Sequence, residues 1–354
     1  MNVRQRINTV FDGKIPDRIP FTLYPELVPR GTVERAIRNK GCGIFAEAIP
    51  YVEEKPDVKI IREERVENHK KIVRETYVTP VGEVYEEKIA YSQYFEGEMW
   101  LKKHMIKSLE DYPVVEFIIQ NTVYHPEYNN LFMLQEYVGN DGIVSARLDY
   151  PPFQKLLIFY LGFDRLVSDI YDYPDEVHKL LNCLDKKQDE MYKIAAGAPT
   201  RIVRCRSNLT SSTTPPPWFE KYLLPFYNKQ AAVLHEKGKL YGAHFDGELS
   251  ALVNLIAKTD LDIIEAFTPP PMGDLSLKKA RQLWEDKIIW ANFPSSLSLC
   301  AKFEIRQFMR NLLIEIAPGD RFILGITEDI PQKTWEKTLR TVAEVLYEEG
   351  NCPL

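Results

Sequence analysis

Three polar residues that could do chemistry together lie in one short stretch, residues 240–272. His244 and Asp246 close a short apolar run typical of a strand, a helical run follows, and Glu265 lies near the end of a second apolar run. Strand, helix and strand within about thirty residues predict a βαβ unit with parallel strands. The carboxyl ends of both strands then meet at one edge of the sheet. One imidazole and two carboxylates at that edge are a ligand set that suits zinc.

The same residues also have structural interpretations. His244 could be a buried, hydrogen-bonded histidine of the core. Asp246 could cap the helix that follows it, because an aspartate at this position accepts hydrogen bonds from the first helical N–H groups. The pattern of this stretch leaves both interpretations open.

The elements around this stretch predict the fold. Short apolar runs, each followed by a helical pattern, occur near residues 20, 44, 143, 203, 242, 263, 290 and 323. Eight such repeats predict an α/β fold, a closed TIM-type (β/α)8 barrel, as a single domain over residues 1–354. A doubly wound open sheet is the alternative, although no glycine-rich dinucleotide fingerprint or phosphate loop is present.

Residues 57–91 break this rhythm. Extended runs near 58–66, 72–78 and 83–89 are joined by tight turns at Glu67-Asn68-His69-Lys70 and Thr79-Pro80-Val81-Gly82. Three short runs joined by turns predict an antiparallel β meander inserted into the barrel.

In a barrel of this type the active site lies at the carboxyl ends of the strands. Arg147 follows the run near 143, Arg206 and Asn208 follow the run near 203, and Asn292 ends the run near 290. We predict that these four residues bind substrate. The two arginines could clamp a substrate carboxylate, since guanidinium binds that group through two parallel hydrogen bonds. The alternative is that each arginine pairs with an acidic neighbour.

The last predicted strand runs into another acidic pair, Glu328 and Asp329. Asp329 is placed to cap the final helix, with Pro331 in its first turn. Glu328 precedes that cap and is therefore freer to take part in chemistry.

Composition narrows the class of protein. The chain of 354 residues is 45% hydrophobic and carries a net charge of −6, which gives no support to nucleic-acid binding. Its five cysteines are scattered without a CxxC pair, which favours a reducing, cytoplasmic location over a disulfide framework. Neither a signal-peptide pattern nor an apolar run of membrane-spanning length is present, so we expect no membrane association.

Several segments resemble the uroporphyrinogen decarboxylase superfamily. Residues 12–20 (DGKIPDRIP) look like its opening motif, and residues 241–247 (YGAHFDG) look like its H-x-C-G site. Residues 322–331 (FILGITEDIP) look like its last strand and the following turn. The stretches 79–87 (TPVGEVYEE) and 107–112 look like a subgroup close to corrinoid-dependent methyltransferases.

The resemblance implies a TIM barrel and one of two main chemistries. One branch decarboxylates the acetate arms of uroporphyrinogen without a cofactor. The other uses zinc to move methyl groups between a corrinoid protein and an acceptor. The N-terminal arginine-rich signature of the decarboxylase is absent here, where only Arg30 follows Pro20 in that region.

In the thiol methyltransferases of this superfamily, one histidine and two cysteines hold the zinc. The matching positions here are His244, Asp246 and Glu328, so oxygen ligands would replace both sulfurs. Oxygen ligands leave zinc more Lewis acidic, which makes a methyl ether donor a serious option beside an amine or a thiol.

The sequence therefore predicts a zinc-dependent methyltransferase that moves a methyl group from a small methylated substrate to or from a corrinoid carried by a partner protein. Asp246 and Glu265 are the expected catalytic residues, with Glu265 as a fourth zinc ligand or a base. One alternative is a cofactor-free decarboxylase of a tetrapyrrole or a smaller polycarboxylate. Another is a non-catalytic ligand-binding barrel. The sequence leaves the oligomeric state open.

Overall fold

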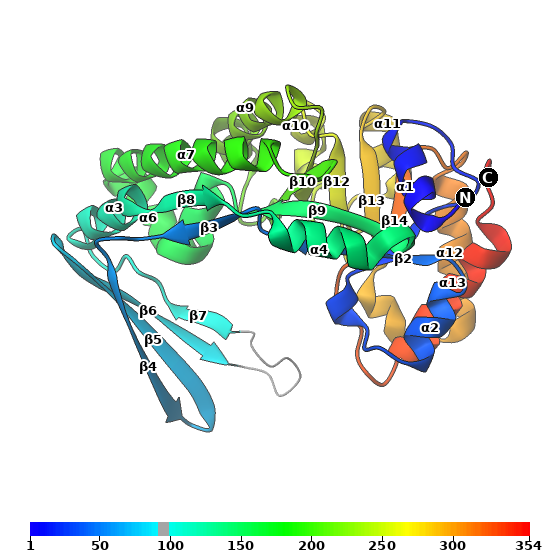
Figure 1. The fold of residues 1–354 in the computed structure, drawn as a ribbon, viewed down its shortest axis with the longest axis horizontal. Coiled ribbons are helices and arrows are strands. Elements are labelled where there is room, and N and C mark those ends of the chain that lie inside the picture. Colours follow the sequence, from blue (N-terminus) through cyan, green and yellow to red (C-terminus); the bar gives the residue numbers. More distant parts are fainter. Residues whose placement is uncertain (91–98) are drawn as a thin grey trace. The chain divides into compact units, whose positions relative to one another are not determined.

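The computed structural model describes residues 1–90 and 99–354 and divides them into two compact units (Figure 1). We call residues 1–50, 127–149 and 195–354 the barrel unit, and residues 51–126 and 150–194 the insert unit. The prediction that residues 1–354 form a single domain stays a prediction.

The barrel unit contains a closed barrel of parallel strands. In chain order these are β1 (Phe21–Leu23), β2 (Cys42–Ala48), β9 (Gly142–Leu148), β10 (Ile202–Cys205), β11 (Leu240–His244), β12 (Ile263–Phe267), β13 (Ile288–Asn292) and β14 (Phe322–Ile326). Each strand pairs with the next in this order, and β1 pairs with β14 to close the ring. The predicted (β/α)8 barrel is confirmed, including the run near residue 44.

One helix of the barrel unit, α1, precedes the first strand, and the others lie between or after the strands. These helices are α1 (Val3–Phe11), α2 (Thr32–Arg38), α4 (Asn129–Val138), α8 (Pro216–Trp218), α9 (Leu224–His235), α10 (Val253–Ile256), α11 (Leu277–Leu283), α12 (Lys302–Glu315) and α13 (Trp335–Glu349). The helix after β11 is much shorter than the sequence pattern suggests, because a 3-10 turn at Ser250–Leu252 takes up part of that run.

A cluster of buried apolar residues forms a core inside the barrel. It includes Phe45, Ile202, Ile263 and Trp290 from four strands, together with residues of α1 such as Phe11. Side chains two positions apart along a strand lie on the same face. The next inward positions toward the carboxyl ends are therefore polar, and they are Glu47, Arg204, Glu265 and Asn292.

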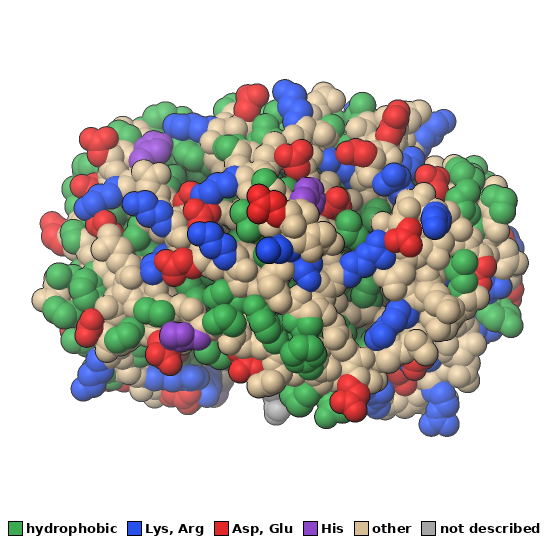
Figure 2. Space-filling model, turned by 45° about the horizontal axis from the view of Figure 1, so that its top comes forward, with side chains coloured by type: hydrophobic (Ala, Val, Ile, Leu, Met, Phe, Trp, Pro, Cys, Tyr) green, Lys and Arg blue, Asp and Glu red, His purple; other side chains and the backbone are tan. Residues whose placement is uncertain are grey.

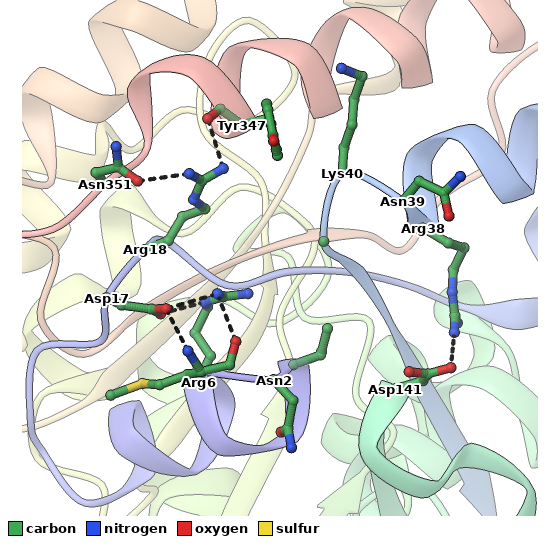
Figure 3. A pocket seen from close by; sticks show the side chains of 13 residues that line it. Asn2, Arg6, Asp17, Arg18, Arg38, Asn39, Lys40, Asp141, Tyr347 and Asn351 are labelled. Carbon is green, nitrogen blue, oxygen red and sulfur yellow. Dashed lines mark hydrogen bonds and ion pairs between the residues drawn. The ribbon is translucent and has the colours of Figure 1, made fainter.

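A polar cavity of about 510 Å³ lies where α1, α2 and the end of α13 meet (Figure 3). Arg6 donates a hydrogen bond of 2.7 Å to Asp17, and Arg38 donates one of 2.6 Å to Asp141. Arg18 donates to the backbone oxygen of Tyr347 at 2.7 Å. These contacts join α1 and the end of α13 to the loop at Asp17 and Arg18, and they join α2 to the turn before β9.

The insert unit contains two antiparallel sheets. One has four strands in the order β4 (Lys59–Glu67), β5 (Lys70–Thr79), β6 (Gly82–Ala90) and β7 (Met99–Lys103). This confirms the predicted meander and adds a fourth strand to it. The other sheet pairs β3 (Tyr51–Glu54) with β8 (Val123–Pro126), and the sequence pattern does not predict this pairing.

The helices of the insert unit are α3 (Asp111–Asn121), α5 (Pro152–Lys155), α6 (Phe163–Asp172) and most of α7 (Pro174–Ala196). Helix α3 contacts β5 and β6. The phenol of Tyr112 on α3 donates a hydrogen bond of 2.7 Å to Asp169 on α6. Helix α5 is followed directly by a π-helical turn at Leu156–Tyr160.

On the face drawn in Figure 2, Lys and Arg side chains alternate with Asp and Glu side chains. In the part of the chain that the structure describes, no helix is long and apolar enough to cross a membrane.

Candidate active site at the barrel mouth

His244 and Glu265 meet at the carboxyl ends of β11 and β12. They are partners in the parallel register of these strands, and His244 Nδ1 lies 2.8 Å from Glu265 Oε2. Glu265 is 1% exposed. The predicted βαβ unit is thus present, and it brings these two residues into direct contact.

A bulge follows directly after Glu265. The register between β12 and β13 shifts between Glu265 and Phe267, and the residue between them, Ala266, has a φ of 59°. Residues other than glycine rarely adopt a positive φ. Bulges at a barrel rim often change the direction of a neighbouring side chain. The local strain is therefore located beside the candidate site.

Arg204 on β10 links Glu265 to the other side of the barrel. Its Nη1 donates to Glu265 Oε2 at 2.7 Å, and its Nε donates to Glu47 Oε1 at 2.6 Å. Its Nη2 also pairs with the second oxygen of Glu47. Arg204 is 5% exposed, so two carboxylates compensate a charge that is almost completely removed from water.

Tyr24 completes the contacts of Glu265. Its hydroxyl donates a hydrogen bond of 2.7 Å to Glu265 Oε1. Both oxygens of Glu265 are therefore engaged, one by Tyr24 and the other by Arg204 and His244. Burial and the nearby carboxylates raise the pKa of the Tyr24 phenol well above its ordinary value, so this hydroxyl stays a donor.

The electrostatics of the pair place a proton on His244 Nδ1. Burial would raise the pKa of Glu265, but the charges of Arg204 and His244 outweigh it and lower that pKa to about 2. Burial would lower the pKa of His244, but Glu265 and Asp246 raise it to about 9. An ionised Glu265 can only accept, so Nδ1 of His244 carries the hydrogen of the bond between them.

The other ring nitrogen of His244 faces Asp246, and Glu328 interacts with both residues through its charge. His244 Nε2 lies 3.5 Å from Asp246 Oδ2. Glu328, in the loop after β14, accepts a hydrogen bond of 3.2 Å from the hydroxyl of Ser295. Burial raises the pKa of Glu328, and the charge of Asp246 adds to this rise while His244 opposes it. The three predicted zinc ligands are therefore electrostatic neighbours.

The distances between these side chains can be compared with the ligand spacing that a zinc ion requires. Two ligands of one tetrahedral zinc, at bonds of about 2.0–2.2 Å, are separated by about 3.3–3.6 Å. The 3.5 Å between His244 Nε2 and Asp246 Oδ2 matches this spacing. Among the described residues, no group of three or more His, Cys, Asp and Glu is close enough to hold a metal ion. The residues fit zinc in donor type and as a pair, and Glu328 must approach to complete the set.

Arg147 lies beside Arg204 in the register of β9 and β10. Burial and the charge of Arg206 lower the pKa of Arg147. Within the described residues, neither a hydrogen bond nor an ion pair joins the Arg147 guanidinium to another side chain. The predicted pair of arginines thus lies together at the barrel mouth, with Arg147 half-buried.

The two predicted asparagines differ in their surroundings. Asn208 is exposed just past β10, with a φ of 42°. Asn292 is 0% exposed, donates to Thr268 at 3.3 Å and accepts from the backbone N–H of Thr327 at 3.1 Å. Asn292 therefore holds the loop that carries Glu328, and its predicted contact with substrate stays a prediction.

Tyr24, Glu47 and Arg204 belong to the site but were missed in the sequence. A signal was available for two of them. Glu47 lies two positions beyond Phe45 and Arg204 two positions beyond Ile202, so both fall on the inward face of their strands. Tyr24 follows the first strand directly and has no such pattern around it.

These features define an α/β barrel with its polar site at the carboxyl ends of the strands. Residues 156–348 match the family model described as uroporphyrinogen decarboxylase (URO-D). This match covers more than half of the chain, and the chain belongs to that family.

The chain is similar to the following two solved structures, and the first of them supports the fold. A methyltransferase from Methanosarcina mazei is 12% identical over 98% of this chain and 99% of its own, with a TM-score of 0.58. A catalytic module of the pneumococcal exo-beta-D-N-acetylglucosaminidase StrH is 9% identical over 97% of this chain and 87% of its own, with a TM-score of 0.40. No curated protein sequence matches the chain.

Proposed function

We propose that this protein is a zinc-dependent methyltransferase that moves a methyl group from a small methylated substrate to or from a corrinoid carried by a partner protein. The observation that carries the proposal is the orientation of the His244 imidazole ring. Glu265 holds the ring through Nδ1, and Nε2 is turned toward Asp246. Histidines that ligate a metal usually donate their other ring N–H to a carboxylate in this way.

In this proposal His244, Asp246 and Glu328 hold the zinc. When bound, zinc supplies a Lewis acid that polarises the oxygen, nitrogen or sulfur atom to which the methyl group is attached. The side chain of Asp246 is 27% exposed, whereas Glu265 is 1% exposed. Of these two carboxylates beside His244, Asp246 is therefore the one that a substrate can reach.

Glu265 acts on this site through His244. The sequence suggested a fourth zinc ligand or a base, but Tyr24, Arg204 and His244 already occupy both of its oxygens. This favours a role in orienting the imidazole and in keeping Nε2 directed at the mouth.

Arg147, Arg206, Asn208 and Asn292 are proposed to contact the substrate. Arg147 supports this best, because a half-buried guanidinium without an acidic partner in the described residues favours an incoming anionic group. The charges of Glu47 and Glu26 act on Arg147, and Arg204 already bonds both oxygens of Glu47. The substrate would then present its carboxylate to Arg147 and its methyl group to the side of His244.

A second candidate function is a metal-free decarboxylase. It is favoured by the pKa of about 9 of His244, which keeps the imidazole protonated at neutral pH beside Arg204. In that case Arg147 and Arg206 would bind a carboxylate and His244 or Asp246 would deliver a proton to the carbon that loses carbon dioxide.

Zinc-loaded protein, mixed with reduced corrinoid and a panel of methyl ethers, methylamines and methyl thioethers, tests the proposal. Methyl transfer changes the visible spectrum of the corrinoid, and it should occur with at least one substrate and be abolished by Asp246→Ala. Release of carbon dioxide from a polycarboxylate without metal would support the decarboxylase instead. Binding of ligands without turnover in either assay would point to a non-catalytic barrel.

A further inference from the structure

Strand β4 is an exposed edge of the four-stranded sheet in the insert unit (Figure 1). All nine of its residues, from Lys59 to Glu67, are exposed. Three of them are large and apolar, with exposed fractions of 49% for Ile60, 39% for Ile61 and 77% for Val66. An edge strand of this length presents unpaired backbone groups that can pair with another strand.

The hairpin between β4 and β5 determines which backbone groups face outward. Its two turn residues, Asn68 and His69, have φ values of 50° and 62°, typical of a type I′ turn. A two-residue turn is closed by a hydrogen-bonded pair, here Glu67 with Lys70. Because hydrogen-bonded pairs alternate, the odd-numbered residues of β4 bond to β5. The even-numbered residues direct their N–H and C=O groups to the open edge.

A second copy of β4 can pair with this edge in an antiparallel arrangement centred on Glu63. In that register, Lys59 faces Glu67 of the second copy, and Arg62 faces Glu64. Each of these opposite-charge pairs occurs twice, because the arrangement has a two-fold axis. Like charges directly opposite each other occur only at the axis, between the two copies of Glu63.

Two apolar residues of β4 also face each other across this two-fold axis. Ile60 faces Val66 of the second copy in this register, and both are even-numbered residues whose backbone groups point outward. A register shifted by one residue is excluded. Even-numbered residues, whose backbone N–H and C=O groups point to the open edge, would then face odd-numbered residues, whose groups already bond to β5. A shift by two residues places Lys59 against Arg65 in one direction and pairs Ile61 with Glu67 in the other.

We propose that β4 is a homodimer interface in which two copies of this chain extend their sheets into one through antiparallel pairing of residues 59–67. Backbone hydrogen bonds supply the attraction and the mirrored charges select the register. A contact made by two edge strands is small, so we expect a reversible dimer with a dissociation constant in the micromolar range, about 1–100 μM.

Sedimentation velocity of the full chain over a range of concentrations tests this interface. The wild type should show a concentration-dependent equilibrium of monomer and dimer. In Lys59→Glu, the new glutamate faces Glu67 of the second copy at both ends of the interface. In Glu67→Lys, the new lysine faces Lys59 of the second copy at both ends. Like charges then repel, so each variant alone should be monomeric. An equimolar mixture of the two variants restores both pairs and should form a heterodimer.

The control is Lys278→Glu, which makes the same charge change at an exposed position of α11 and should dimerise like the wild type. Circular dichroism of each variant verifies that it is folded. A monomeric wild type at 200 μM (about twice the weakest constant expected), or variants that dimerise as the wild type does, would overturn the proposal. A mixture without heterodimer would overturn it as well.

A cross-link gives a second, independent readout. Glu63 faces itself across the axis as a non-hydrogen-bonded pair, where Cα atoms are about 4.5 Å apart, within the range of a disulfide. The Glu63→Cys variant should form a covalent dimer in mild oxidant, whereas Lys278→Cys should not. Equal cross-linking of the two variants would contradict the interface.

Discussion

Glu265 Oε2 accepts hydrogen bonds from two sources at once, His244 Nδ1 at 2.8 Å and Arg204 Nη1 at 2.7 Å. The shared oxygen holds the imidazole at a fixed orientation on the barrel mouth. It also joins three neighbouring strands, β10, β11 and β12. The orientation of His244 therefore depends on residues that never need to touch a substrate.

Replacing Glu265 by Gln should weaken zinc binding. The amide can still bond to His244, but it removes the negative charge that makes the imidazole a better ligand, and such partners of metal ligands typically change affinity about 10–100-fold. Titration of metal-free protein with zinc measures this. Tyr24→Phe is the matched control, since it removes one hydrogen bond of Glu265 and keeps the charge. Equal zinc affinity in Glu265→Gln and wild type would rule out the orienting role.

Replacing Arg204 by Met should destabilise the fold. The change removes the buried guanidinium that compensates Glu47 and leaves His244 as the charge beside Glu265. Breaking a buried pair in this way typically costs about 3–5 kcal/mol. Urea unfolding measures the loss. Arg340→Met removes a partly exposed pair with Glu336 and should cost less than about 1 kcal/mol. Similar losses for both variants would show that the Arg204 network adds little to stability.

Asp17 predicts a pH dependence of stability (Figure 3). The hydrogen bond from Arg6 lowers its pKa from 3.8 to about 2, against a smaller opposing effect of burial. A carboxyl with a lowered folded-state pKa stabilises the fold above its unfolded pKa and loses that contribution as the pH falls through the folded value. Asp17→Asn should therefore unfold at lower urea than wild type at pH 7, and the gap should shrink from about pH 4 toward pH 2. A gap that is constant across this range would contradict the assignment.

Arg147 predicts a preference for anionic substrates. A hydrogen-bonded charge pair is worth about 1.5–3 kcal/mol, so Arg147→Met should raise the KM for a carboxylate-bearing substrate about 10–150-fold. The KM for the corresponding neutral amide should change little. Steady-state rates with each acid and amide pair provide the comparison, and a similar change for both would assign Arg147 to structure instead.

Much of this architecture was predictable because it follows from local patterns. Apolar runs and helical periodicity indicated the barrel, and the βαβ unit at residues 240–267 predicted the meeting of His244 and Glu265. Arg204 and Glu47 were not predicted, because a charged residue within a short strand is recognised as inward-facing only when the register of its neighbours is known. The pairing of β3 with β8 joins segments about seventy positions apart in the chain and gives no local signal.

The residues of the candidate site could be predicted from the sequence less completely than the fold could. The proposed zinc ligands His244 and Asp246 are two positions apart and could be recognised together. Glu328 comes from another strand, and its distance from the other two depends on the loop that Asn292 and Ser295 hold. Such loop geometry depends on tertiary contacts, which spacing along the chain does not reveal.

Zinc content, measured by elemental analysis after loading and exhaustive desalting, tests the central claim most directly. Wild type should retain about one zinc per chain, His244→Ala should retain none, and His235→Ala, which alters an exposed histidine outside the site, should match wild type. Circular dichroism would verify that all three are folded. Folded wild-type protein that retains no zinc, or a His244→Ala variant that retains as much as wild type, would contradict the proposed metal site.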